Sequence, residues 1–150
     1  MSDYERIVHI LRQQNERITI QRRLVIEALV DTQAHMTIND VNEHIRLRQN
    51  EHNLSETTIY RILQWLKGLE LVSQTDMAES GIVYQIIGLE KHHHLVCLNC
   101  NKTTDIDDSL FDAMREELLR QYDFHARIDH MAIYGYCANC LPIMEDESED

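Results

Sequence analysis

The four cysteines of this chain form two closely spaced pairs, Cys97 with Cys100 and Cys137 with Cys140. A two-residue gap lets both thiolates of a pair bind one ion, and two such pairs supply the four ligands of a tetrahedral structural zinc site. Disulfide bonds are one alternative, disfavoured because we expect no secretory signal at the polar N-terminus. A redox-active C-x-x-C is another, but that motif belongs at a strand-to-helix turn, and each pair here is predicted to end a strand.

Three consecutive histidines, His92, His93 and His94, lie just before the first cysteine pair. On a strand His92 and His94 project to one side and His93 to the other, so one face could chelate a metal. Surface or structural histidines are the alternative, and the neighbouring cysteine pair favours metal binding. Asp105 can add a carboxylate, and His35 lies in a loop before a predicted helix. Nitrogen and oxygen donors of this kind suit Fe²⁺, Mn²⁺, Ni²⁺ or Zn²⁺.

A second chemical feature is the outer face of a helix that Ser55 can cap. Its apolar residues recur at helical spacing from Ile59 to Leu69, which predicts a buried stripe. The opposite face carries hydroxyl and guanidinium donors that can reach phosphates and base edges in a DNA major groove: Thr57, Thr58, Tyr60 and Arg61. An ordinary solvated helix face is the alternative interpretation.

The elements around this helix favour the DNA interpretation. Two amphipathic helices are predicted before residue 33, and Thr37 with Asp40 resembles a capping box at the start of a third. A β-hairpin, Leu71–Thr75 with Ile82–Ile87, follows the capped helix. Three helices, a recognition helix and a hairpin make a winged helix-turn-helix pattern.

Beyond Gly88 the pattern changes to short strands and one helix. We expect strands near 95–98, 103–106 and 127–136 and a helix near 109–122. The inner face of that helix is predicted to be lined by Leu110, Met114, Leu118 and Tyr122. The fold class is therefore α+β, with an N-terminal winged helix-turn-helix at 1–88, a small C-terminal α/β dimerisation domain at 89–141, and an acidic tail at 142–150 that is expected to be disordered.

Size and charge set further bounds. A chain of 150 residues holds one domain or two small ones, and small domains need support from a metal or a partner subunit. The net charge of −12 is concentrated after residue 90, so it does not exclude DNA binding by the N-terminal part. No stretch is long and apolar enough to span a membrane, and we expect a cytoplasmic protein.

Four ordered motifs resemble the ferric uptake regulator family of bacterial metal-dependent repressors, over roughly residues 4–141. They are the segments 17–22 (RITIQR), 57–61 (TTIYR), 92–100 (HHHLVCLNC) and 133–140 (IYGYCANC). The resemblance implies a winged helix joined by a hinge to a dimerisation domain, with metal ions bound between and within them. The protein is then a homodimer that binds double-stranded DNA at a palindromic operator.

The resemblance also implies roles for individual residues. The four cysteines match the ligands of structural Zn²⁺, and Tyr60 and Arg61 match DNA-contacting residues. The ligands of a regulatory divalent metal, Fe²⁺, Zn²⁺ or Mn²⁺, are matched by His35, His92, His94 and Asp105. Gln85 stands where the family usually has a further carboxylate at this site.

A second metal site of some family members is matched only in part. Its four counted positions hold Lys91, His93, Asp112 and Asp129, with His130 adjacent to the last. Only His93 and Asp112 match the expected ligand types.

The predicted function is therefore a metal-dependent transcriptional repressor that controls metal homeostasis. A zinc-responsive uptake regulator and a peroxide-sensing regulator are alternatives within the family. A zinc hydrolase and a metal-buffering module without DNA binding are alternatives outside it. We expect no enzyme, because the sequence shows no H-E-x-x-H helix, nucleophile elbow or glycine-rich phosphate loop.

Overall fold

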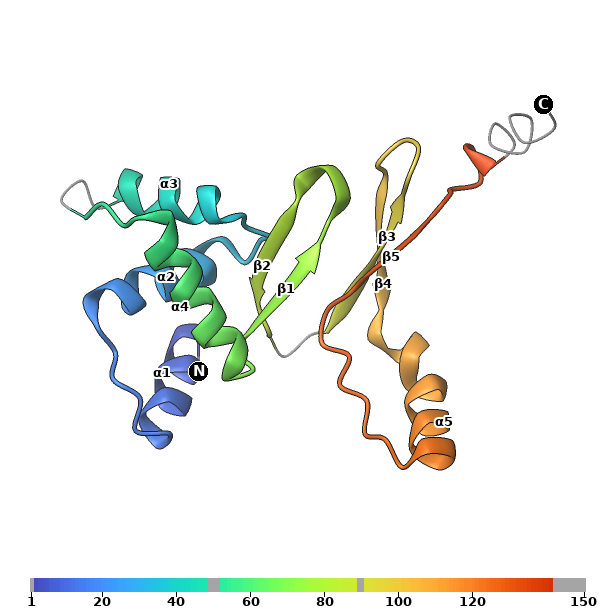
Figure 1. Cartoon of the computed structure of the whole chain (residues 1–150), viewed down its shortest axis with the longest axis horizontal. Coiled ribbons are helices and arrows are strands. Elements are labelled where there is room, and N and C mark those ends of the chain that lie inside the picture. The colour runs from blue at the N-terminus through green and yellow to red at the C-terminus, as the bar shows by residue number, and fades with distance from the viewer. Residues whose placement is uncertain (1, 49–51, 89–90, 142–150) are drawn as a thin grey trace. The chain divides into compact units, whose positions relative to one another are not determined.

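The computed structural model describes residues 2–48, 52–88 and 91–141. It confirms the mixed α+β class with the following helices and strands (Figure 1): α1 (Asp3–Gln13), α2 (Ile20–Thr32), α3 (Ile38–Arg48), α4 (Glu56–Gly68), β1 (Val72–Asp76), β2 (Ile82–Ile86), β3 (His92–Cys97), β4 (Thr103–Asp107), α5 (Asp112–Tyr122) and β5 (Ala132–Gly135). Two short 3₁₀ turns, η1 (Ala78–Ser80) and η2 (Asp108–Phe111), adjoin β1 and β4. None of the described helices combines the length and apolarity needed to span a membrane.

The chain divides into two compact units. The described residues within 1–74 and 82–88 form the first unit, and those within 75–81 and 89–150 form the second. The division passes through the β1–β2 hairpin, whose tip is grouped with the second unit. The domain limits 1–88 and 89–141 stay a prediction, and the acidic tail at 142–150 lies outside the described residues.

Side-chain caps begin the helices of the first unit. The predicted capping box before α3 is confirmed: the Thr37 amide donates to Asp40 Oδ2 at 2.8 Å, and the Asp40 amide donates to Thr37 Oγ1 at 3.2 Å. Ser55 Oγ accepts a 3.1 Å hydrogen bond from the Thr58 amide and begins α4. These bonds satisfy amides that the helix itself leaves without partners.

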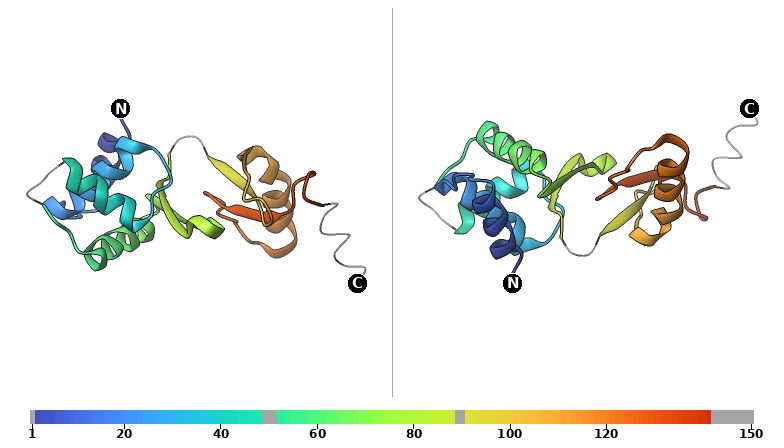
Figure 2. Two further views of the ribbon diagram at one scale, coloured as in Figure 1. Left: turned by 90° about the horizontal axis from the view of Figure 1, so that it is seen from above. Right: turned by 90° about the horizontal axis from the view of Figure 1, so that it is seen from below.

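The helices α1 to α4 lie together in the ribbon views (Figure 1 and Figure 2), and their buried side chains form one apolar core. The buried stripe of α4 comprises Ile59, Ile62, Leu63 and Leu66. Tyr84 of β2 extends the core to the hairpin, since its side chain is buried with the helical residues. The stripe predicted for α4 is therefore confirmed, except that Leu69 packs at the edge of the core.

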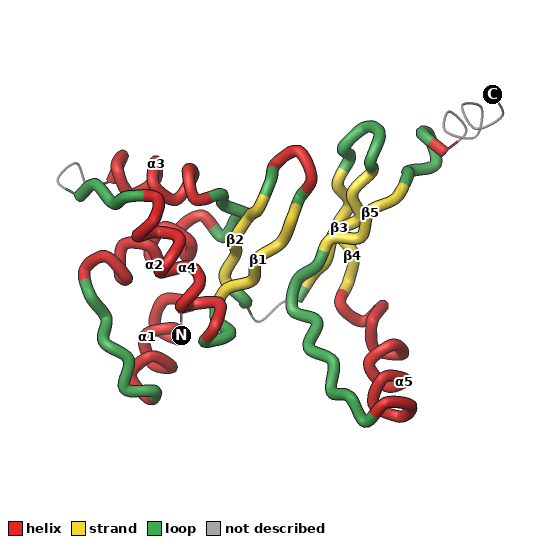
Figure 3. Tube along the Cα trace, viewed as in Figure 1, coloured by secondary structure: helices red, strands yellow, loops and turns green. Residues whose placement is uncertain are grey.

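A backbone bridge ties the loop between α2 and α3 to β2. The Met36 amide donates to the Tyr84 carbonyl at 3.0 Å, and the Tyr84 amide donates to the Met36 carbonyl at 2.8 Å. Figure 3 shows this loop running beside the hairpin strand. His35 directly precedes the bridged residue.

The second unit contains a three-stranded sheet of order β4-β3-β5. Strand β3 pairs antiparallel with β4, which sets His94 opposite Asp105, and parallel with β5, which sets His94 beside Ala132. The strand expected over 127–136 is shorter, because residues 127–131 approach the sheet without joining its ladder except at Met131, whose carbonyl accepts from the His94 amide at 2.9 Å.

The inner face predicted for the last helix is wrong for the single chain. Leu110, Met114 and Tyr122 are 67%, 43% and 70% exposed, and α5 has no buried residue. The physical reason is that α5 packs mainly against the adjoining turn η2, where Phe111 is buried, and not across the sheet. Helical period locates an apolar stripe but does not identify its partner.

Candidate metal centres and recognition helix

The two cysteine pairs converge in the second unit. Cys97 ends β3, Cys100 lies in the turn after it, and Cys137 and Cys140 follow β5. The four sulfur atoms lie within 4.8 Å of one another, and all four cysteines are free thiols. The Cys100 and Cys137 sulfurs are 3.8 Å apart. That distance equals the edge of a tetrahedron with zinc–sulfur bonds of about 2.3 Å, whereas a disulfide requires about 2.0 Å.

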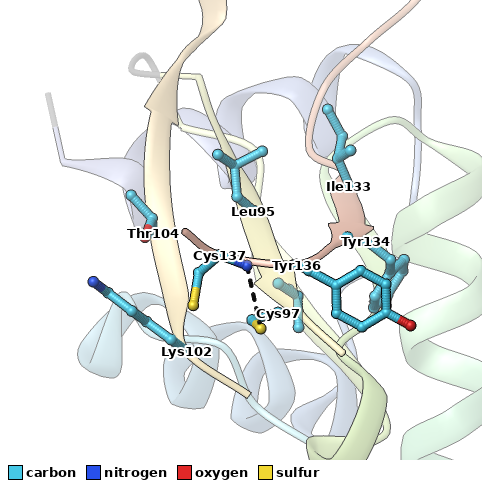
Figure 4. Close-up of a pocket in the computed structure, with 10 residues that line it drawn as sticks. Leu95, Cys97, Lys102, Thr104, Ile133, Tyr134, Tyr136 and Cys137 are labelled. Atoms are coloured by element: carbon cyan, nitrogen blue, oxygen red, sulfur yellow. Dashed lines mark hydrogen bonds between the residues drawn. The ribbon is translucent and has the colours of Figure 1, made fainter. Parts of the chain in front are cut away.

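Backbone amides near this cluster favour the thiolate form of Cys97. Amide hydrogen bonds, first from Cys100 and then from Cys137, lower the pKa of Cys97 to about 6. Figure 4 shows the second of these bonds, in which the Cys137 amide lies 3.4 Å from the Cys97 sulfur. Zinc binds thiolates, so the residues present fit a structural Zn²⁺ site.

An apolar hollow of about 190 Å³ adjoins the cysteine cluster on one face of the sheet (Figure 4). Leu95, Ile133 and Tyr136 line it, and each is about 40% exposed. The hollow is partly open to solvent, and most of its exposed lining is apolar. Exposed apolar residues of this kind are typical of a surface that contacts another protein.

The histidine cluster lies on the same sheet. Ring nitrogens of His92, His94 and His130 are within 4.8 Å of one another. His94 Nε2 is 2.7 Å from His130 Nε2, and His94 Nδ1 is 2.7 Å from Asp105 Oδ1. Burial lowers the pKa of His94, although Asp105 opposes this shift, so the ring is neutral and able to bind metal at neutral pH. The structure thus brings together His92, His94 and Asp105, as the sequence suggested.

His130 was missed as a member of this cluster. In the sequence it stands out only as the neighbour of Asp129. It lies two residues before β5, and the parallel pairing of β5 with β3 brings it to His94. The only signal in the sequence is a further histidine near the end of the chain, because strand pairing between distant segments cannot be read from local patterns.

His35 belongs to the first unit, where it is half-buried in the loop that the Met36–Tyr84 bridge holds. Its predicted role as a regulatory ligand stays a prediction.

His93 and Asp112, the residues of the partial second site, have different neighbours. His93 is fully buried, and its Nε2 lies 2.8 Å from Asp108 Oδ1. Arg115 donates to Asp108 Oδ1 at 2.5 Å and to Asp112 Oδ1 at 3.0 Å, and the guanidinium lowers the pKa of Asp108. These side chains form an ion-paired network around the Arg115 guanidinium. Among the described residues, neither His93 nor Asp112 belongs to a group of side chains that could hold a metal ion.

The predicted recognition helix α4 presents an exposed polar face. Thr57 and Arg61 are exposed, and Tyr60 is 48% exposed. Thr58 is half-buried, and its hydroxyl lies 2.9 Å from Ser55 Oγ at the cap. The helix is also held from α2, because the Arg22 guanidinium stacks 3.7 Å from the Trp65 ring.

Comparison with known proteins assigns a family to this arrangement. The model of the ferric uptake regulator family matches residues 13–134. The ferric uptake regulation protein of Campylobacter jejuni is 26% identical over 136 residues, which are 91% of this chain and 87% of that protein. The peroxide-responsive repressor PerR of Staphylococcus aureus is 26% identical over 138 residues, covering 92% of this chain and 91% of the repressor.

Solved structures support the same fold. The Helicobacter pylori ferric uptake regulator, described as having three functional metal-binding sites, matches with a TM-score of 0.66 and 24% identity over 93% of this chain and 91% of that chain. The Pseudomonas aeruginosa ferric uptake regulator with manganese matches with a TM-score of 0.67 and 20% identity over 85% of this chain and 95% of that chain.

Proposed function

Because this chain belongs to the ferric uptake regulator family, we propose that it is a metal-dependent DNA-binding transcriptional repressor that controls metal homeostasis. The observation that carries the proposal is the cluster of His92, His94 and His130, in a chain whose other unit presents the exposed polar face of α4. A metal-binding group and a DNA-reading helix in one protein are the two parts that a metal-controlled regulator needs.

Metal control acts through shared coordination. A divalent ion, when bound, would supply coordinate bonds to the side chains proposed to hold it. His35 is the proposed ligand of the first unit, and His92 and His94 are proposed ligands of the second, with Asp105 hydrogen-bonded to His94. These residues thereby restrict how the two recognition helices of a homodimer are presented to a palindromic operator. To convert a population that mostly cannot bind DNA into one that mostly can, the metal must bind the DNA-binding conformation more tightly by about 5 kcal/mol, which several ligands can supply.

The second unit supports dimerisation in this proposal. Its exposed apolar side chains include Leu95 and Ile133 on the sheet and Leu110 and Met114 near α5. A small unit gains stability when a second copy covers such surface. The Cys₄ cluster holds a structural Zn²⁺ that fixes the end of this sheet, and the reduced thiols suit the cytoplasm.

The sensed metal distinguishes the alternatives within the family. Relatives include both ferric uptake regulation proteins and PerR repressors at 26% identity. Chains of similar fold include a ferric uptake regulator solved with manganese and a zinc-bound manganese uptake regulator, so Fe²⁺, Zn²⁺ and Mn²⁺ are all candidates. A catalytic role is not part of the proposal, because the family consists of regulators.

Electrophoretic mobility shifts test the function. Full-length protein is incubated with fragments of its own promoter and of metal-transporter promoters, together with Fe²⁺, Mn²⁺, Zn²⁺ or a chelator. We expect at least one metal to tighten binding, and we expect Arg61→Ala to weaken it while Arg12→Ala, an exposed arginine on α1, does not. Equal DNA affinity with every metal and with the chelator would reject the proposal.

A further inference from the structure

The donor atoms that the second unit offers at the histidine cluster are all imidazole nitrogens. His92 and His94 come from β3, and His130 comes from the bend before β5. The ring centroids of His92 and His130 are 5.3 Å apart, and those of His94 and His130 are 4.7 Å apart. Three rings, two from β3 and one from the bend before β5, therefore lie close together.

The hydrogen bonds orient these rings. His94 Nδ1 lies against the Asp105 carboxylate, which can only accept, so Nδ1 carries the proton and the Nε2 of neutral His94 carries a lone pair. His130 Nδ1 lies 2.5 Å from the Thr75 hydroxyl, so its Nε2 is the atom that faces His94 Nε2 at 2.7 Å. His94 is 2% exposed, and its lone pair therefore points into the cluster and away from bulk water.

Asp105 is placed behind this cluster. Its oxygen contacts the Nδ1 side of His94, opposite the nitrogen that faces His130, and its side chain is 73% exposed. It is not among the side chains whose ligand atoms lie within 4.8 Å of one another. A carboxylate on the far nitrogen of a histidine fixes the tautomer and the ring orientation, and it raises the basicity of the near nitrogen.

We propose that His130 is a ligand of the regulatory metal with His92 and His94, that Asp105 positions His94 without binding the ion, and that the site consequently prefers Zn²⁺ to Mn²⁺. The inference rests on the proposed function and specifies its metal. Imidazole suits zinc, whereas manganese prefers carboxylate and water oxygens. Manganese also lies below zinc in intrinsic affinity for nitrogen sites.

Metal titration of the full-length protein tests the inference. The protein is treated with a mild chelator until one tightly held zinc per chain remains, and Co²⁺, Zn²⁺ and Mn²⁺ are then titrated separately and in competition. The variants are His130→Ala, His130→Gln and Asp105→Asn. His125→Ala, which removes an exposed imidazole of the same unit, is the matched control.

We expect the wild-type protein to prefer Zn²⁺ to Mn²⁺ and to give visible Co²⁺ absorption bands. Asp105→Asn should weaken Zn²⁺ binding about 10- to 100-fold, as loss of an outer partner does, and should keep the Co²⁺ band shape. Both His130 variants should weaken it by more than about 100-fold and change the band shape. His125→Ala should match the wild type.

Wild-type Zn²⁺ affinity and an unchanged Co²⁺ spectrum in both His130 variants would overturn the inference, as would Mn²⁺ binding as tight as Zn²⁺ binding. A variant that retains the structural zinc and the wild-type circular dichroism spectrum is folded. Two different substitutions of His130 are used so that the test still works if one variant does not fold. These outcomes are separate from the mobility shifts, since a site without His130 can still control DNA binding.

Discussion

At the scale of single residues, the thiolates of the second unit differ from its imidazoles in what they can do. Cys97 and Cys140 are buried, the four sulfurs lie within 4.8 Å of one another, and amide hydrogen bonds stabilise the Cys97 thiolate. Such a closed set of four ligands leaves no open coordination position, which is typical of structural zinc. The histidine cluster offers three imidazoles within the second unit, and in the proposed function it is the site at which the regulatory metal binds and leaves.

The first prediction concerns Cys97→Ser. Loss of one thiolate should reduce the bound zinc from one per chain towards zero and lower the melting temperature of the protein, because metal binding free energy is folding free energy in small metal-built units. Metal analysis with thermal unfolding measures both effects. Leu98→Ala changes an exposed residue of the same turn and should retain zinc. A stable, fully zinc-loaded Cys97→Ser protein would contradict the structural role.

At the scale of elements, sequence patterns predicted what is local. The Thr37–Asp40 box, the Ser55 cap and the stripe of α4 depend on residues within a few positions of one another, and all are present. The pairing of β5 with β3 joins segments nearly 40 residues apart, so the position of His130 could not be predicted. The same limit explains α5, whose apolar residues were assigned to an inner face that the single chain does not have.

The second prediction concerns the hydrogen bonds that join α5 to residues outside the helix. Arg115 donates to Asp108 Oδ1 and, at 3.0 Å, to the Ile128 carbonyl, so Arg115→Met leaves both acceptors without this partner. We expect a loss of about 1–3 kcal/mol in the free energy of unfolding. Arg120→Met, on the same helix, removes an exposed pair with Glu117 and should cost less than about 1 kcal/mol. Urea unfolding of zinc-loaded protein compares them, and equal losses would disprove the distinction.

At the scale of the whole molecule, two features of the chain have opposite effects on DNA binding. A net charge of −12 repels DNA, whereas the proposed dimer presents two recognition helices together. Binding should therefore depend on correct pairing of subunits and should weaken steeply with salt. We expect the exposed apolar residues around the hollow of the second unit to contribute to the pairing of subunits in the proposed dimer.

The third prediction tests that surface. Leu95→Glu introduces a charge beside Ile133 on the open face of the sheet, and burying this charge in a subunit contact would be costly. We expect the variant to shift from dimer to monomer in sedimentation analysis and to lose DNA binding. Leu47→Glu, at a residue of α3 that is 75% exposed, should stay dimeric. An unchanged Leu95→Glu dimer would place the subunit contact elsewhere.

The bridge between Met36 and Tyr84 has a mechanical consequence. Two main-chain hydrogen bonds, one in each direction, join the residue after His35 to a core residue of β2. The loop that carries His35 is therefore held to β2 at the residue directly after His35. If His35 holds the regulatory metal as proposed, its displacement is transmitted through Met36 to β2 and to the helices that share a core with Tyr84.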